Sequence, residues 1–276
     1  MILREPCLPP GWYPGNRAKI AEFLASFAKK GDAEAAIAPH AGWYYSGSCA
    51  AGAVSSLISE AETVAVIGGH LPDGMPVLAA AEDAIKTPLG TMTIDAELRE
   101  AFMQKQETRP DRYQDNTVEV LLPMVHYFFP EAKLLWLRFP ASLSSFEAGK
   151  LLAETAASLG RKMVTIASTD LTHYGDNYGY SPRGSGKTAL EWVKNVNDAG
   201  FINAVLEGDP VKVLKHAEEN YSACSAGAVL GALGFAAFNG LNQRRLLKYQ
   251  NSAEINNEGE NIPDSFVGYA GIAISK

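Results

Sequence analysis

Three of the five histidines follow short apolar segments that are typical of buried strands. His40 lies in APHAGWYYSG, His70 in VIGGHLP, and His173 in STDLTHYG, where Asp170 precedes it. In open α/β sheets, ligands bind at the carboxyl ends of the strands. One histidine in such a place is more often a hydrogen-bonding loop residue than a ligand, but three equivalent placements favour a functional site. We therefore expect His40, His70, Asp170 and His173 to meet at one edge of a sheet.

Cys224 lies in NYSACSAGAV, where a buried helix is predicted to begin. A helix N-terminus favours thiolate over thiol, so this cysteine is a candidate metal ligand. The alternative is a small buried hydrophobic residue. We assign Cys7 and Cys49 to that packing class, and we interpret His126 and His216, which lie inside predicted helices, as structural or surface residues.

Imidazole nitrogens and a thiolate suit iron, copper or zinc, and do not suit magnesium or calcium. Two histidines and one anionic ligand resemble the arrangement of non-haem iron sites, and a cysteine as the anion moves the preference toward softer ions such as Cu(I) or Zn. If His40, His70 and Cys224 hold the metal, Asp170 and His173 would orient a ligand or move a proton.

The elements that must position these residues alternate between strand and helix. Strands are predicted over residues 35–38, 63–67 and 163–167, and helices over residues 117–128 and 187–206. Such alternation predicts a single α/β domain over residues 1–276, with a mixed, mostly parallel sheet between layers of helices.

Composition excludes several classes of protein. The chain has 276 residues and a formal net charge of −7, without a Lys/Arg cluster, so nucleic acid and anionic membranes are not expected as partners. Three cysteines do not make a disulfide framework, and we see neither an export signal nor an apolar run long enough to span a membrane. We expect a cytoplasmic protein.

The motifs together resemble the Memo family, whose prokaryotic members are called AmmeMemoRadiSam system protein B. The resemblance is carried by WYPG, PHAGWYYSG, the His after GG, STDLTHYG, the cysteine at a helix start and the ending SFVGYAGIA. Memo proteins are similar in fold to the catalytic subunit of class III extradiol dioxygenases, which implies an α/β/α sandwich with one cleft. The resemblance implies that His40, His70 and Cys224 bind copper or iron in a redox role, with Asp170 and His173 close by.

The same resemblance implies an association with other AmmeMemoRadiSam proteins, and the animal protein is described as binding phosphotyrosine peptides. Two positions depart from the family. Relatives often carry Glu-His-Ser where this chain has Asp115-Asn116-Thr117, so a histidine is absent at 116, while Glu119 is kept. The His70 motif is GGH where relatives often have GPSH or GPNH. Dioxygenases use a glutamate where Memo has the cysteine, so ring cleavage is not implied.

Three functions stay open from the sequence. The first is a dioxygenase-like, metal-dependent oxidoreductase. The second is a non-catalytic protein that binds a peptide or small anion in the same cleft, and the third is a zinc-type hydrolase with Asp170 as base. For any small-molecule or peptide ligand, the candidate contact residues are Tyr44, Glu119, Tyr174 and Tyr178.

Overall fold

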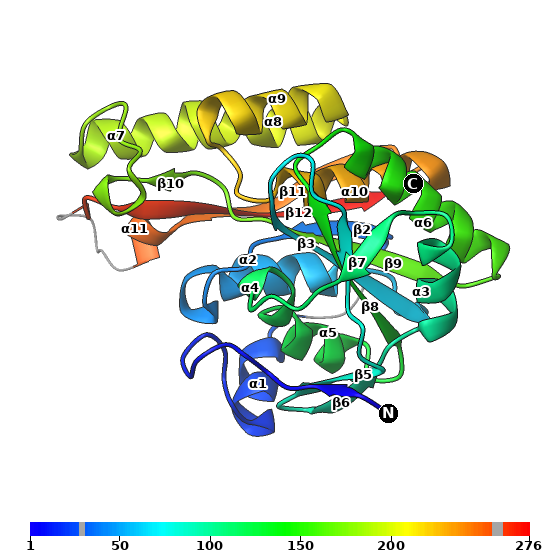
Figure 1. Cartoon of the computed structure of the whole chain (residues 1–276). Coiled ribbons are helices and arrows are strands. Elements are labelled where there is room, and N and C mark those ends of the chain that lie inside the picture. The colour runs from blue at the N-terminus through cyan, green and yellow to red at the C-terminus, as the bar shows by residue number, and fades with distance from the viewer. Residues whose placement is uncertain (28–30, 256–261) are drawn as a thin grey trace.

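The computed structural model describes residues 1–27, 31–255 and 262–276 (Figure 1). Its main sheet has a core of parallel strands in the order β2 (Ala35–Ala38), β9 (Met163–Ser168), β3 (Thr63–Leu71) and β8 (Lys133–Pro140). Antiparallel neighbours border this core, with β12 (Phe266–Ser275) beside β2 and β4 (Val77–Ala79) beside β8. The remaining strands of this sheet are β10 (His173–Tyr174) and β11 (Gln243–Asn251), which pair with β12, and β7 (Thr108–Pro110), which pairs with β4.

Residues of the central strands alternate between two apolar cores, one on each face of the sheet. Ile37 and Ile67 belong to one core, whereas Ala36 and Val66 belong to the other. Because successive side chains of a strand point to opposite faces, a strand covered on both sides is apolar at consecutive positions. The predicted strand segments with the runs AAIA and VAVI are therefore the buried centre of the molecule.

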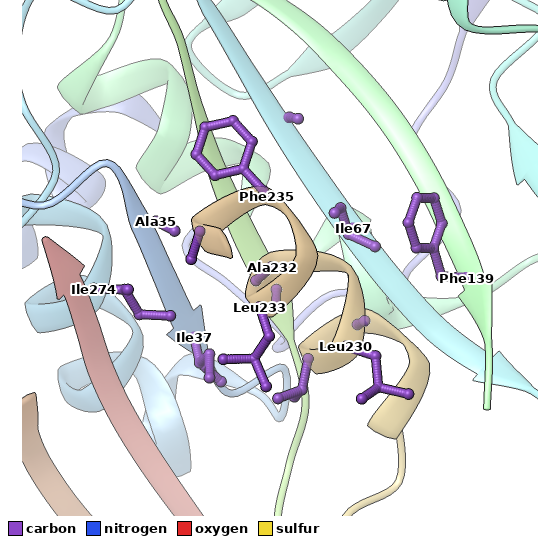
Figure 2. Close-up of a cluster of buried hydrophobic side chains, with 14 of the residues drawn as sticks. Ala35, Ile37, Ile67, Phe139, Leu230, Ala232, Leu233, Phe235 and Ile274 are labelled. Carbon is purple, nitrogen blue, oxygen red and sulfur yellow. The ribbon is translucent and has the colours of Figure 1, made fainter. Parts of the chain in front are cut away.

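Helices cover both faces of the sheet, which confirms the predicted α/β sandwich (Figure 1). One layer consists of α3 (Ala96–Met103), α6 (Ser144–Ser158), α8 (Ala199–Glu207), α9 (Pro210–Asn220) and α10 (Ala226–Asn239). The other contains α1 (Arg17–Leu24), α2 (Trp43–Ser55) and α5 (Leu122–Phe128). Figure 2 shows α10 lying across the strands, with Leu230 and Leu233 packed among Ile37 and Ile67.

Small residues allow α10 to approach its neighbours closely. A Cβ added at Gly149 of α6 would lie 2.0 Å from the carbonyl oxygen of Gly231 in α10. A Cβ at Gly227, near the start of α10, would lie 2.0 Å from the carbonyl oxygen of Pro140 at the end of β8. The glycines of the AGAVLGALG segment thus seat this helix against the sheet and place its first turn at the strand ends.

The predicted single helix over residues 117–128 is wrong. The chain forms α4 (Asn116–Glu119) and then α5, with a break between them. Pro123 lies in the first turn of α5, where its missing N–H costs nothing, whereas inside a longer helix it would remove a hydrogen bond. The predicted helix over residues 187–206 is formed by α7 (Gly186–Trp192), the π-helix Val193–Asp198 and α8.

The smaller elements complete the molecule. A second sheet contains β1 (Leu3–Arg4), β5 (Ala84–Thr87) and β6 (Gly90–Thr93). A short 3₁₀ helix (Asp176–Tyr178) follows β10, and α11 (Ser252–Ile255) follows β11. Among the described residues, none of the helices combines the length and the apolar character that crossing a bilayer demands.

Candidate metal centre

The carboxyl end of β9 lies between those of β2 and β3, so the segments after these strands meet at one edge of the sheet. His40 comes two residues after β2, and His70 is the second-last residue of β3. Cys224 precedes α10, which packs across the same strands. As a result, His40, His70 and Cys224 each offer a ligand atom within 4.8 Å of those of the other two.

Both imidazoles are oriented through their Nδ1 atoms. His40 Nδ1 is 2.9 Å from the Ser168 hydroxyl, and its Nε2 is 3.2 Å from Cys224 Sγ. His70 Nδ1 is 3.0 Å from the Asp115 carboxylate. The two rings meet edge to face with centroids 4.9 Å apart. Each histidine therefore keeps its Nε2 for the shared centre, as metal-binding histidines commonly do when a second group engages the other nitrogen.

Backbone hydrogen bonds tie the three contributing segments together. The His40 N–H donates to Asp170 Oδ1 over 2.7 Å, and the Cys224 N–H donates to the Asp170 carbonyl oxygen over 3.2 Å. The Ser225 N–H donates to the Thr169 hydroxyl over 3.2 Å. The two peptide N–H groups next to the thiol are therefore already used, and the segment after β9 fixes His40 and Cys224 relative to each other.

Electrostatics favour a thiolate at Cys224. Burial alone would raise the pKa of its thiol, but the His40 and His70 imidazoles hold that pKa well below its ordinary value. Burial lowers the pKa of His40, yet the Cys224 thiolate and Asp170 raise it overall. Burial acts in the same way on His70, whereas hydrogen bonds to Asp115 and Cys224 raise its pKa to about 10. The imidazoles thus stabilise the thiolate, a role that had been predicted for the helix N-terminus.

The loop that carries His70 has an unusual backbone. His70 has a φ of +56°, in the left-handed region that side-chain-bearing residues rarely adopt. A Cβ at Gly68 would lie 2.2 Å from Thr117 Oγ1, and one at Gly69 would lie 2.4 Å from Ser225 Cβ. The sequence GGH therefore lets the end of β3 press against α4 and the start of α10, so that His70 reaches the centre.

A cleft of about 660 Å³ opens above these residues. His40, His70, Asp170 and His173 all line it. Its walls include five aromatic rings, which belong to Trp12, Tyr45, Tyr178, Phe266 and Tyr269. No lysine or arginine is among the described residues that line the cleft.

The two residues predicted to handle protons lie beside the centre. Asp170 is buried, and its Oδ2 is 3.9 Å from His40 Nε2. Burial raises the pKa of this carboxyl, against the opposing effect of His40. His173 is half-buried at the cleft wall, where its Nδ1 lies 3.1 Å from the Leu171 carbonyl oxygen and its ring meets that of Tyr178.

The other predicted contact residues lie in different surroundings. Tyr178 lines the cleft, whereas Tyr44 is 68% exposed on α2 and is not among the lining residues. Tyr174 is fully buried behind the wall, stacked on Phe266 with its hydroxyl donating to the Gly184 carbonyl oxygen. Glu119 is also buried, and its carboxylate accepts hydrogen bonds from the N-terminal segment instead of facing the cleft.

The sequence profile of the Memo-like protein family matches residues 4–273. The chain belongs to the Memo-like family. A MEMO1 family protein of Archaeoglobus fulgidus is 31% identical and one of Pyrococcus abyssi is 28% identical, with 98% and 100% of both chains covered, respectively. A solved structure of an uncharacterised protein from Escherichia coli K12 aligns with a TM-score of 0.45 and 15% identity, over 86% of this chain and 98% of the other.

Several residues of this Memo-like cleft were missed from the sequence, and three of them illustrate why. Trp12 and Tyr45 line its walls, and Asn116 lines it while donating to the His40 carbonyl oxygen over 2.9 Å. Asn116 stands where the family resemblance implied a histidine, so the departure at this position was the signal for a cleft residue. Tyr45 differs from Tyr44 only by its place in the first turn of α2, which the sequence pattern does not resolve.

Proposed function

We propose that this Memo-like protein is a metal-dependent oxidoreductase that holds iron or copper with His40, His70 and Cys224. The observation that carries the proposal is the meeting of one cysteine sulfur with two imidazoles, both of which line a cleft. When bound, iron or copper would supply redox chemistry and Lewis acidity to a small molecule in that cleft.

The residues fit such an ion in both distance and chemistry. Metal–nitrogen and metal–sulfur bonds are about 2.1 and 2.3 Å long, so two donors on one ion lie at most about 4.4 Å apart. Cys224 Sγ and His40 Nε2 are 3.2 Å apart, and all three ligand atoms lie within 4.8 Å, so only small side-chain adjustments are needed. The lowered pKa of Cys224 supplies the thiolate that a soft metal requires.

The chain's own groups would control protons and water around the centre. Asp170 has a buried carboxyl with a raised pKa, so it is suited to hold a proton beside His40. His173 offers a second titratable group at the wall of the cleft. The aromatic rings of the cleft would shield the body of a bound molecule from water, which would strengthen polar interactions near the metal.

The surroundings of Cys224 favour a ligand over a nucleophile. A cysteine nucleophile in acyl transfer needs nearby donors for the developing oxyanion. The N–H groups of Cys224 and Ser225 already donate to Asp170 and Thr169. The adjacent backbone therefore has no free pair of donors, and metal binding is the better use of the thiolate.

The cleft supports a small uncharged molecule better than a phosphopeptide or another anion. Proteins usually recognise phosphate with arginine or lysine side chains. In the described part of the chain, the lining residues include neither. An anionic group would depend on the metal for a positive partner.

An anaerobic metal titration of wild type and Cys224→Ser tests the proposal. We expect wild type to bind Fe(II) or Cu(I) with micromolar or better affinity in chelator competition, and Co(II) to give thiolate charge-transfer absorption that the variant lacks. The iron- or copper-loaded protein should cycle between two oxidation states. Binding of zinc alone would overturn the redox assignment and favour a hydrolase, and binding that ignores Cys224 would overturn the site.

A further inference from the structure

The side chain that orients His70 belongs to a buried charged network outside the ligand set. We infer that Asp115, held in place by Arg138, is the positioning residue of the metal centre and sets the orientation and tautomer of His70. This inference rests on the proposed function, because it concerns the same three ligands. It gives a role to a pair of residues that neither bind the metal nor line the cleft.

Asp115 is placed to accept hydrogen bonds from several directions. Its side chain is 10% exposed, and its Oδ2 is 3.0 Å from His70 Nδ1 and 3.2 Å from a terminal nitrogen of Arg138. Its Oδ1 accepts from the N–H of Thr117 over 2.8 Å and from the Thr117 hydroxyl. Since an ionised carboxylate only accepts, His70 must present a proton at Nδ1, which leaves Nε2, on the side of Cys224, as the nitrogen that a metal would bind.

Arg138 acts on the His70 backbone as well as on Asp115. Its Nε donates to the carbonyl oxygen of Gly69 over 2.9 Å, at the peptide directly before His70. Residues in the left-handed region are strained and persist only where their surroundings hold them. The guanidinium thus holds the strained peptide while it holds the carboxylate that orients the side chain, and both contacts direct His70 to the centre.

The network also contains a matched control. Arg138 is 4% exposed, and on its other side it pairs with Asp111 at 3.4 Å. Asp111 also accepts from the Trp136 indole N–H over 2.8 Å. Asp111 and Asp115 are therefore carboxylates on the same buried guanidinium, but only Asp115 bonds to His70. A role in stability alone would be shared by both, whereas a positioning role belongs to Asp115.

The test compares Asp115→Asn with Asp111→Asn. An amide at 115 can turn its NH₂ toward His70 Nδ1, which moves the ring proton to Nε2 and removes the lone pair that a metal needs. We expect Asp115→Asn to weaken Co(II) binding by about 10- to 100-fold in chelator competition, as is typical of groups that orient metal ligands. We expect Asp111→Asn to stay within about threefold of wild type, and Asp115→Glu to recover more affinity than Asp115→Asn.

Spectroscopy separates positioning from a general loss of structure. In Asp115→Asn at saturating Co(II), the thiolate charge-transfer band should persist while the d–d bands shift, because Cys224 stays bound and His70 does not. Melting temperatures of the metal-free variants show whether each one folds. If wild type binds metal through Cys224 but both asparagine variants bind equally well, the inference is wrong and the proposed function survives. If wild type binds no metal in a Cys224-dependent way, the proposed function fails first.

Discussion

The two histidines of the centre are supported in opposite ways. His40 is 1% exposed and follows β2, and its Nδ1 forms a hydrogen bond with the neutral Ser168 hydroxyl. The His70 side chain is 33% exposed, and its Nδ1 forms a hydrogen bond with the Asp115 carboxylate. The backbone of His70 is in the left-handed region. A ligand that packing already confines needs little help from its hydrogen-bond partner, whereas an exposed and strained ligand needs a charged one. Single substitutions on the two sides of the site can test this contrast.

Removal of either imidazole should have the largest effect, and an equal one. A structural metal site contributes about 10–16 kcal/mol through four ligands, so one ligand corresponds to roughly 2.5–4 kcal/mol, or about a hundredfold to a thousandfold in affinity. We expect His40→Ala and His70→Ala each to lose about this much in chelator competition with Co(II). A large loss from only one of them would contradict the comparison, because only that histidine would then be a ligand of the ion.

The next largest effect is expected in the segment after β9, which contains Asp170, the residue that accepts a hydrogen bond from the His40 N–H. Asp198 accepts from the N–H and hydroxyl of Thr172 and from the Tyr249 hydroxyl, and burial raises its pKa from 3.8 to about 7. Because the folded-state pKa lies above the unfolded one, its contribution to stability is complete below the unfolded value and declines as pH rises toward about 7.

We therefore expect wild type to lose about 2 kcal/mol of unfolding free energy between about pH 5 and pH 7 through this group. Asp198→Asn should show a flatter pH dependence in urea denaturation. Parallel curves for the two proteins would contradict the assignment. The affinity of folded Asp198→Asn for Co(II) shows whether Asp198 also affects the geometry of the metal centre.

Glu119 anchors one wall of the cleft without touching either histidine. Its carboxylate accepts from the N–H groups of Cys7 and Leu8, from the Cys7 thiol and from the Tyr13 hydroxyl, and thereby holds both ends of the segment that contains Trp12. Glu119→Gln loses charge-assisted hydrogen bonds, so we expect a loss of about 2 kcal/mol in thermal or urea unfolding. Metal affinity should stay unchanged, and a parallel loss of Co(II) binding would show that the wall and the centre are not separate.

The smallest effect is expected at Ser168. Its hydroxyl bonds to His40 Nδ1, but the imidazole is also confined by burial and by Cys224 and Asp170. Ser168→Ala should therefore weaken Co(II) binding by no more than about fivefold, below the effect of Asp115→Asn, since a neutral hydrogen bond is worth about 1 kcal/mol or less. An effect as large as that of Asp115→Asn would mean that the two histidines do not differ in support.

The sequence predicted the sheet and the meeting of His40, His70 and Cys224 because parallel strands bring the residues after them to one edge. Their role as ligands stays a prediction.

The break before α5 was missed, although Pro123 in the first turn of α5 is a sequence signal for the start of a helix. The sequence does not show which of Tyr44 and Tyr45 lines the cleft. Neighbouring helix residues point in different directions, and those directions depend on where α2 begins. The acceptor of His70 could not be predicted, because the Asp115–Arg138 pair joins residues 23 apart across two elements.

The single turn of α4 has a consequence for how this cleft can diversify. Asp115 caps it and orients His70, Asn116 faces the cleft, and Glu119 at its end anchors the N-terminal segment. Neighbouring residues of a turn project about 100° apart, so one short element serves three separate surfaces. A sequence change that rotates or lengthens it would disturb all of them at once. New ligand preferences are therefore more accessible through the loop residues Pro10 and Trp12, whose side chains can be exchanged while the turn stays intact.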